Sequence, residues 1–168
     1  MDSSGILIDG FDRIAQSVHR VLDGLEPDAG VFRMDEKANS IAWLVWHLTR
    51  VQDDHVADAA QTDQVWTTGG WFERFDLPFE PSATGYGQDS DDVAAVRVPA
   101  ELLAGYHDAV HDRTAEYLRT LSAADLDRVV DTRWDPPVTL AVRLVSVISD
   151  DLQHVGQAAF VRGIAARR

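Results

Sequence analysis

Apolar residues recur at helical spacing in four long segments of this chain, and this pattern constrains the fold more than any other feature. The segments run from about Ile6 to Leu25, from Ser40 to Ala60, from Pro99 to Leu121, and from the residues after Pro137 to about Ala165. In each segment the apolar side chains repeat every three to four residues, as the buried face of an amphipathic helix does. Almost no stretch alternates as a strand would. The pattern therefore predicts an all-α four-helix bundle.

Length, charge and cysteine content narrow the classes of function. The chain has 168 residues, which suits one bundle domain over residues 1–168. It contains no signal peptide and nothing close to the roughly 20 apolar residues of a membrane span, so we expect a cytoplasmic protein. Its net charge of −13 argues against nucleic acid or membrane as partners. Because there is no cysteine, any thiol chemistry needs a thiol brought by a cofactor.

The connection between the second and third predicted helices, Gln61–Pro99, lacks sustained periodicity and is rich in aromatic residues. These are Trp66, Trp71, Phe72, Phe75, Phe79 and Tyr86. A long loop inside a compact domain is usually functional or disordered, and so many aromatic residues argue against a free linker. We expect the connection to pack over the end of the bundle that holds His47, as a lid over an apolar substrate.

The predicted fourth helix carries ionisable residues on its inward face. At 100° per residue this face includes Arg143, Asp150, Asp151 and His154. Asp150 and His154 stand four residues apart, so their side chains project from the same side of the helix. Ionised groups buried in a bundle need partners or a metal ion. The fourth helix is thus expected to contribute to a polar site in the core.

The predicted second helix carries a residue that could complete this polar site. His47 borders its apolar stripe and should face the fourth helix. One imidazole from one helix, with a carboxylate and an imidazole from another, forms a three-ligand face for a divalent ion with positions open to water or substrate. The pattern predicts His47, Asp150 and His154 as metal ligands.

Two alternatives to this metal site remain open. In the first, Arg143 pairs with Asp150 and the cluster is purely structural. In the second, a metal lies between His107 and His111, which also stand four residues apart. These two histidines lie off the apolar stripe of the third helix, among charged neighbours. We therefore expect them to be at least partly solvated and away from the main pocket.

Two motifs resemble the DinB-like metalloprotein superfamily. One is Ile41–Arg50 followed by Asp53-Asp54-His55, and the other is Asp150–Gln157, which resembles the last-helix motif H-x-x-x-H-x-G-Q. The likeness covers nearly the whole chain and is greatest to short actinobacterial members that resemble mycothiol S-transferases. The chain departs at Asp150, where many relatives have histidine. The related mycothiol-dependent maleylpyruvate isomerases use a carboxylate at that position.

The resemblance implies a DinB-like bundle that holds a divalent metal, zinc or else nickel, and a low-molecular-weight thiol such as mycothiol. It implies Trp43 and Gln157 as cofactor-binding residues, and it leaves room for a homodimer. The implied function is a metal-dependent thiol S-transferase that acts on small electrophiles.

In that reaction, we expect Asp54 or His55 to accept the thiol proton. Arg143 would orient an anionic group or balance the carboxylates. Two other functions remain open. The same three ligands would serve a metal-dependent hydrolase in which water is the nucleophile. A bundle without catalytic activity would bind a small ligand or only dimerise.

Overall fold

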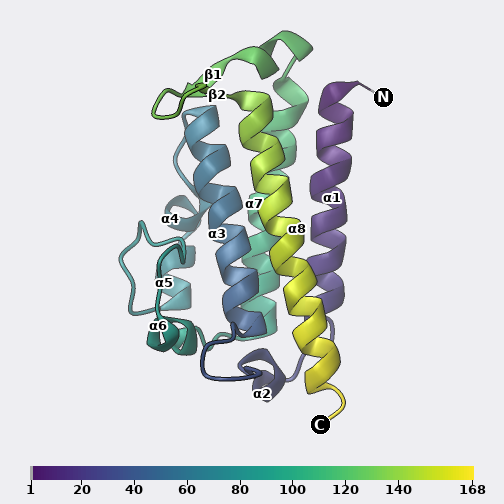
Figure 1. Ribbon diagram of the computed structural model, residues 1–168, viewed down its shortest axis with the longest axis vertical. Coiled ribbons are helices and arrows are strands. Elements are labelled where there is room, and N and C mark those ends of the chain that lie inside the picture. The colour runs from purple at the N-terminus through teal and green to yellow at the C-terminus, as the bar shows by residue number, and fades with distance from the viewer. Residues whose placement is uncertain (1) are drawn as a thin grey trace.

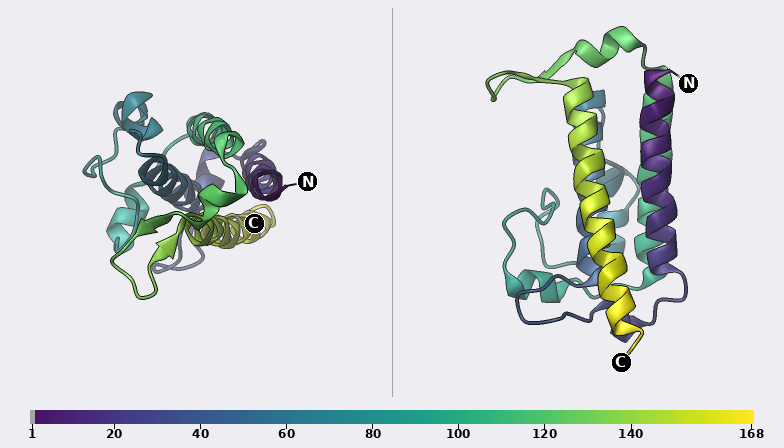
Figure 2. Two further views of the ribbon diagram at one scale, coloured as in Figure 1. Left: turned by 90° about the horizontal axis from the view of Figure 1, so that it is seen from above. Right: turned by 45° about the vertical axis from the view of Figure 1, so that its right-hand side comes forward.

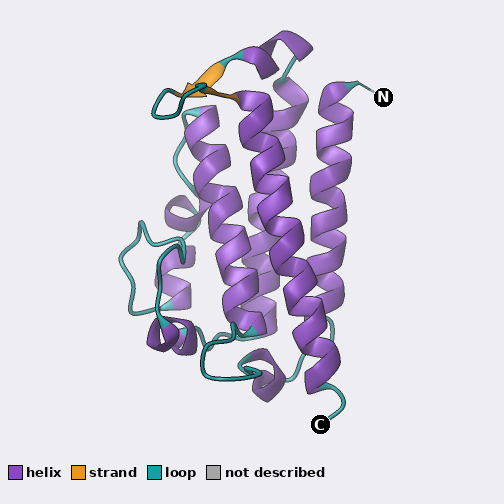
Figure 3. Cartoon of the chain, viewed as in Figure 1, coloured by secondary structure: helices purple, strands orange, loops and turns teal. Residues whose placement is uncertain are grey.

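The computed structural model describes residues 2–168 as four long helices with a small hairpin at one end (Figure 1). The long helices are α1 (Ser3–Leu22), α3 (Ile41–Ala60), α7 (Ala100–Thr120) and α8 (Leu140–Ala165). The short elements are α2 (Pro27–Gly30), α4 (Val65–Thr68), α5 (Trp71–Phe75), α6 (Ser90–Ala95), the 3-10 helix η1 (Ala123–Asp127), and the antiparallel strands β1 (Val129–Asp131) and β2 (Val138–Thr139). Figure 3 shows how little of the chain is strand, which confirms the predicted all-α, DinB-like fold.

Capping residues set the ends of the long helices. Ser40 accepts a hydrogen bond from the backbone of α3, so this helix begins where the sequence predicted. Helix α1 begins earlier than predicted because Asp2 caps it through the Gly5 amide. It ends at Leu22 rather than Leu25, since Gly24 takes a positive φ of 62° just beyond the last turn.

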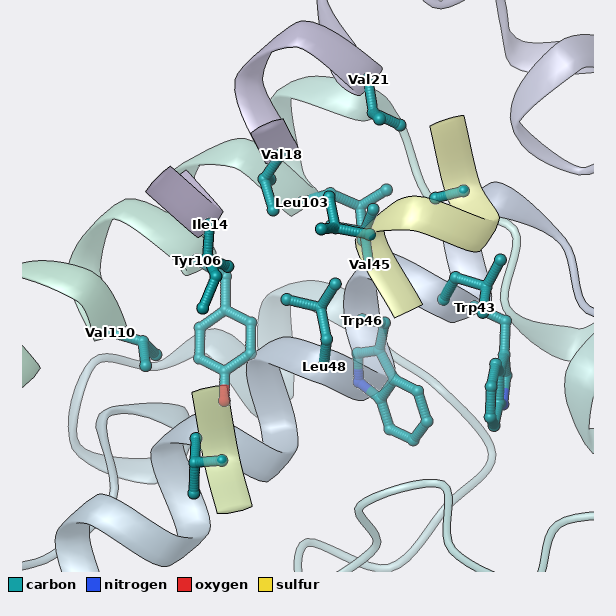
Figure 4. Close-up of a cluster of buried hydrophobic side chains, with 14 of the residues drawn as sticks. Ile14, Val18, Val21, Trp43, Val45, Trp46, Leu48, Leu103, Tyr106 and Val110 are labelled. Carbon is teal, nitrogen blue, oxygen red and sulfur yellow. The ribbon is translucent and has the colours of Figure 1, made fainter. Parts of the chain in front are cut away.

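The apolar core lies between the four long helices. Figure 4 shows Ile14 and Val18 of α1 beside Leu48 of α3 and Leu103 and Tyr106 of α7. Burial of these side chains supplies the main favourable term in folding. Helices α1, α7 and α8 each keep a solvated side, whereas α3 is buried almost all round. Within residues 2–168 no helix is both long and apolar enough to cross a membrane.

Helix α8 is rotated slightly from the predicted orientation. Its fully buried face includes Leu144, Val147 and Asp151, whereas Asp150 and His154 are half-buried. Helices α3 and α8 lie side by side and antiparallel (Figures 1 and 2). The two half-buried residues therefore lie along the line where α8 meets α3, which we call the α3–α8 seam, and not at the centre of the core.

The connection Gln61–Pro99 packs along the side of α3 and α7, so the predicted lid over an end of the bundle is wrong (Figures 1 and 2). The rings of Trp66, Trp71 and Phe75 surround that of Tyr106 at centroid distances of 5.0, 5.7 and 5.7 Å. These aromatic side chains extend the core sideways. They do not close over the bundle.

Two buried charges on α3 explain this course of the connection. Asp53 accepts hydrogen bonds from the backbone amides of Val65 and Trp66, at 2.9 and 2.7 Å. Arg50 donates to the carbonyl of Ala83 at 3.0 Å and lies 3.5 Å from Asp53. Buried charges need such partners. Since the connection supplies them from its own backbone, it is fastened along the helix.

His107 is fully buried, contrary to the prediction that it is partly solvated. Neither of its ring nitrogens has a hydrogen-bond partner within the described residues. Burial, with smaller effects of His111 and His19, lowers the pKa of His107 to about 3. The charged neighbours of His107 suggested a solvated face, but helix α1 covers this side of α7. It does so with two ion pairs, His19–Asp108 and Asp12–His111.

Candidate metal centre

His47 on α3 faces Asp150 and His154 on α8 across the α3–α8 seam. One potential ligand atom from each residue lies within 4.8 Å of the other two. The two imidazole rings are 4.7 Å apart between centroids. His154 Nε2 lies 3.7 Å from Asp150 Oδ1. The three residues thus converge, and their binding of a metal ion stays a prediction.

Hydrogen bonds fix the orientation of both imidazoles. Nδ1 of His47 lies 2.5 Å from the carbonyl oxygen of Thr84. Nδ1 of His154 lies 3.0 Å from Oε1 of Gln157. Since these oxygens only accept, each Nδ1 carries a proton, and Nε2 is the nitrogen left to bind a metal ion. Metal-binding histidines are typically held in this way through their second nitrogen.

Trp43 and Gly85 also hold His47 in place. The indole of Trp43 stacks on the His47 ring at 4.6 Å and donates its Nε1–H to Gln88 at 2.7 Å. Gly85 has a φ of +97°, and a Cβ at this position would lie 2.6 Å from His47 Nδ1. Only glycine allows the connection to approach this closely. Trp43, which the resemblance implies in cofactor binding, therefore contacts a candidate metal ligand directly.

The charge states of these residues fit a divalent cation. Burial lowers the pKa of His47, so its imidazole is neutral at pH 7, the form that binds metal. Asp150 Oδ2 is buried without a hydrogen-bond partner among the described residues, which is unfavourable unless a cation satisfies it. Two imidazoles and a carboxylate are ligands typical of zinc and related ions. Ligand atoms at tetrahedral positions around one zinc ion lie about 3.5 Å apart. The three side chains would therefore need to move together by up to about 1 Å to bind it.

Asp54, His55 and Arg143 form a second polar group farther along the seam. His55 follows His47 by a rise of about 12 Å along the helix. Arg143 Nη1 lies 3.5 Å from His55 Nδ1, and the Asp54 carboxylate lies 3.8 Å from the same nitrogen. Burial, and then the nearby Arg143, lower the pKa of His55. Its imidazole is thus neutral at pH 7 and able to accept a proton.

Asp131 on β1 is a partner that the sequence analysis missed. It accepts hydrogen bonds from Arg133 and, at 2.8 Å, from Arg143. The hydrogen bonds from Arg133 hold the pKa of Asp131 well below its usual range. Arg143 thus pairs with Asp131 instead of Asp150, so the alternative in which Arg143 neutralises Asp150 is wrong. No periodic pattern in the sequence predicts the position of Asp131, because only the β1–β2 hairpin brings it to the start of α8.

The comparisons with known proteins agree with this fold. The family model for mycothiol-S-transferase matches residues 7–166. None of the curated proteins matches the chain. Among solved structures, a conserved protein from Enterococcus faecalis is similar at a TM-score of 0.92 and 28% sequence identity, over 100% of this chain and 99% of that one.

Proposed function

Because this chain belongs to the mycothiol S-transferase family, we propose that it is a metal-dependent enzyme that joins a low-molecular-weight thiol such as mycothiol to small electrophiles. The observation that carries the proposal is the convergence of His47, Asp150 and His154. We assign these residues as ligands of one divalent ion, zinc or else nickel. When bound, the ion would supply the positive charge that keeps a thiol sulfur deprotonated at neutral pH.

The residues around the ligands hold them ready for the ion. Thr84 and Trp43 orient His47, and Gln157 orients His154. This arrangement lowers the reorganisation needed when ion and thiol bind. Because Trp43 and Gln157 border the ligands, we propose that they also contact the thiol.

We assign His55 as the acceptor of the thiol proton. Its neutral imidazole lies on the same seam, and Asp150 lies between His55 and His47 along it, about one helical turn from each. A water molecule between the thiol and His55 would relay the proton across this helical turn. The carboxylate of Asp54, 3.8 Å from His55, stabilises the imidazolium that forms. The sulfur lone pair then forms the new S–C bond, and the leaving group departs with the electrons of its own bond.

Arg143 is proposed to orient an anionic group of the substrate. Asp131 holds one of its nitrogens, Nη2, at 2.8 Å. The other nitrogen, Nη1, points toward His55 and remains available for a ligand. A guanidinium fixed in this way loses little freedom when it binds an anion.

The test is consumption of a chromogenic aryl halide by the zinc-loaded chain with and without mycothiol. The expected rate depends on the thiol and is abolished by a chelator. His55→Gln should lower the rate about 100-fold with unchanged metal content. His19→Gln, an exposed histidine on α1, is the control. Turnover of an ester without any thiol would indicate the hydrolase instead, and no turnover of either substrate class would contradict an enzymatic role.

A further inference from the structure

A tyrosine close to the candidate metal centre is almost wholly exposed to solvent. Tyr86 is 94% exposed, more than any other large hydrophobic side chain within residues 2–168. It lies in residues 84–88, which we call the Tyr86 loop, on the stretch between α5 and α6 beside α3 (Figure 1). Single exposed aromatic side chains are ordinary in soluble proteins, so exposure alone assigns no role. What distinguishes Tyr86 is its position next to His47.

Both ends of the Tyr86 loop are bonded to residues of the candidate metal centre. At one end, the carbonyl of Thr84 accepts the hydrogen bond from Nδ1 of His47. At the other end, Oε1 of Gln88 accepts the indole N–H of Trp43 at 2.7 Å, and this indole stacks on the His47 ring. The two anchors fix the backbone of the loop against the centre. Between them, only the side chain of Tyr86 stands out into solvent.

Two glycines allow the Tyr86 loop to approach His47 closely. Gly85 and Gly87 flank Tyr86 with φ of 97° and 77°, values that favour glycine. A Cβ on Gly85 would lie 2.6 Å from Nδ1 of His47, so the Gly85 Cα is within about 4 Å of that nitrogen. Since consecutive Cα atoms are about 3.8 Å apart, the Cα of Tyr86 is within about 8 Å of it. The phenol ring can therefore contact a ligand that extends from the centre into solvent.

Gln88 adds a polar group beside this ring. Because an indole N–H only donates, the amide oxygen of Gln88 must face Trp43, and its NH2 group is left to donate elsewhere. An aromatic face with an amide donor beside it suits a ring that is apolar on its face and carries hydroxyl groups at its edge. A pyranose sugar is such a ring. It can pack its C–H groups on a phenol while its hydroxyls stay in water.

We propose that Tyr86 and Gln88 form the subsite for the sugar ring of the thiol. This inference rests on the proposed function, in which the thiol sulfur lies at the metal centre. In mycothiol an amide joins the cysteine to a glucosamine ring. An extended residue spans about 3.5 Å, so this ring lies beyond the metal ligands, at the distance where the Tyr86 loop stands. Tyr86 thus selects the thiol through a group remote from its sulfur.

The uncharged surface of the Tyr86 loop fits the same ligand. Its sequence is Thr-Gly-Tyr-Gly-Gln, in a chain where 26% of residues are charged. Mycothiol is neutral apart from its thiol, because its cysteine is acetylated on nitrogen and amidated on carbon. An uncharged ligand gains nothing from a charged surface and depends on packing and hydrogen bonds. The ring of Tyr86 and the amide of Gln88 supply both.

The test is calorimetric titration of the zinc-treated chain with mycothiol and with N-acetylcysteine methylamide, which ends where the sugar begins. Tyr86→Ala should weaken mycothiol binding by about 10-fold and leave the affinity for the truncated thiol unchanged, because only mycothiol reaches the loop. Tyr86→Phe keeps the ring and should bind mycothiol within about 2-fold of the wild type. The control is Trp134→Ala, at an aromatic residue 65% exposed on the β1–β2 hairpin, which should bind both thiols as the wild type does.

Fluorine NMR provides a second readout that needs no turnover. The chain has three tyrosines, and the 3-fluorotyrosine signal of Tyr86 is the one lost in Tyr86→Phe. This signal should shift with mycothiol and stay in place with the truncated thiol.

Three results would overturn the sugar subsite. They are undiminished mycothiol binding by Tyr86→Ala, equal weakening of both thiols in that variant, and an unshifted Tyr86 signal at saturating mycothiol. Turnover of the aryl halide is measured separately. Binding of mycothiol that depends on Tyr86, without any turnover, would contradict the proposed function and support the subsite. A wild type that binds neither thiol would overturn both.

Discussion

The backbone carbonyl of Thr84 accepts a hydrogen bond from Nδ1 of His47 over 2.5 Å, and this bond joins the connection to the candidate metal centre. It decides which nitrogen of His47 is left for a metal ion. The approach is possible because Gly85 has no side chain and because Arg50 holds the neighbouring carbonyl of Ala83. A loop far from His47 in sequence therefore sets the orientation of this ligand.

Gly85→Ala should weaken metal binding by about 10-fold or more, the usual effect of disturbing an outer partner of a ligand. The new Cβ would lie 2.6 Å from His47 Nδ1 and must displace either the ring or the Thr84 carbonyl. Zinc affinity measured by competition with a chromogenic chelator would show the loss.

The matched control for this prediction is Gly87→Ala. Gly87 also has a positive φ, of 77°, but a Cβ there would meet nothing within 4 Å. Both variants should lose about 1 kcal/mol of stability from backbone strain. Equal zinc affinities in the two variants would show that the Thr84–His47 contact does not control the site.

Arg50→Met should destabilise the fold by about 3 kcal/mol, because it leaves the buried carboxylate of Asp53 without its counter-charge. Arg50→Met with Asp53→Leu should recover part of this loss. Urea unfolding would measure both. Hydrogen exchange should quicken at the amides of residues 82–85 in the single variant. Undiminished protection there would mean that Arg50 does not fasten the connection.

Stability should fall with acid below about pH 6.5 because of His107. Its pKa is lowered to about 3 in the folded chain, so between these pH values the unfolded chain binds the extra proton. From pH 7 to pH 5 this group alone removes about 2 kcal/mol. His107→Leu should remove that part of the pH dependence, whereas His19→Leu, at an exposed position, should keep it. Urea unfolding free energies at both pH values would check this, and identical pH dependence in wild type and His107→Leu would contradict it.

Gln157→Leu should lower zinc affinity by about 10-fold, since Gln157 fixes the protonated nitrogen of His154. The control is Gln153→Leu, one turn earlier, whose amide bonds Ser149 on the exposed side of α8. Isothermal titration calorimetry would measure the zinc affinity of both variants. A larger loss in Gln153→Leu than in Gln157→Leu would argue against this role of Gln157.

Local signals in the sequence were enough to predict the bundle and the members of the candidate centre. The helix Ile41–Ala60 follows from Ser40 as a cap and from apolar periodicity. Asp150 and His154 share a face through their spacing alone. These features depend only on helix geometry, which holds whatever the helix packs against.

The features of the site and core that the sequence did not predict depend on contacts between segments that are distant in sequence. Thr84 reaches the seam from a loop and Asp131 from the three-residue strand β1. Both segments are too short or too irregular for periodicity to predict which way a side chain or carbonyl points. The prediction that His107 is partly solvated was wrong because α7 packs against both α1 and α3. The buried part of its surface is therefore wider than its single apolar stripe indicates. The buried pair Arg50 and Asp53 shows the same limit, since its partners are backbone groups of the connection.

The metal content of the purified chain, measured by mass spectrometry of the elements after growth with zinc, tests the central claim most directly. The account predicts about one equivalent of divalent metal in the wild type and in His111→Ala, a control histidine outside the site. His47→Ala and His154→Ala should retain less than about a tenth of it, with their helix content unchanged. Equal metal content in all four proteins, or none in the wild type even after zinc is added, would contradict the assignment of this centre.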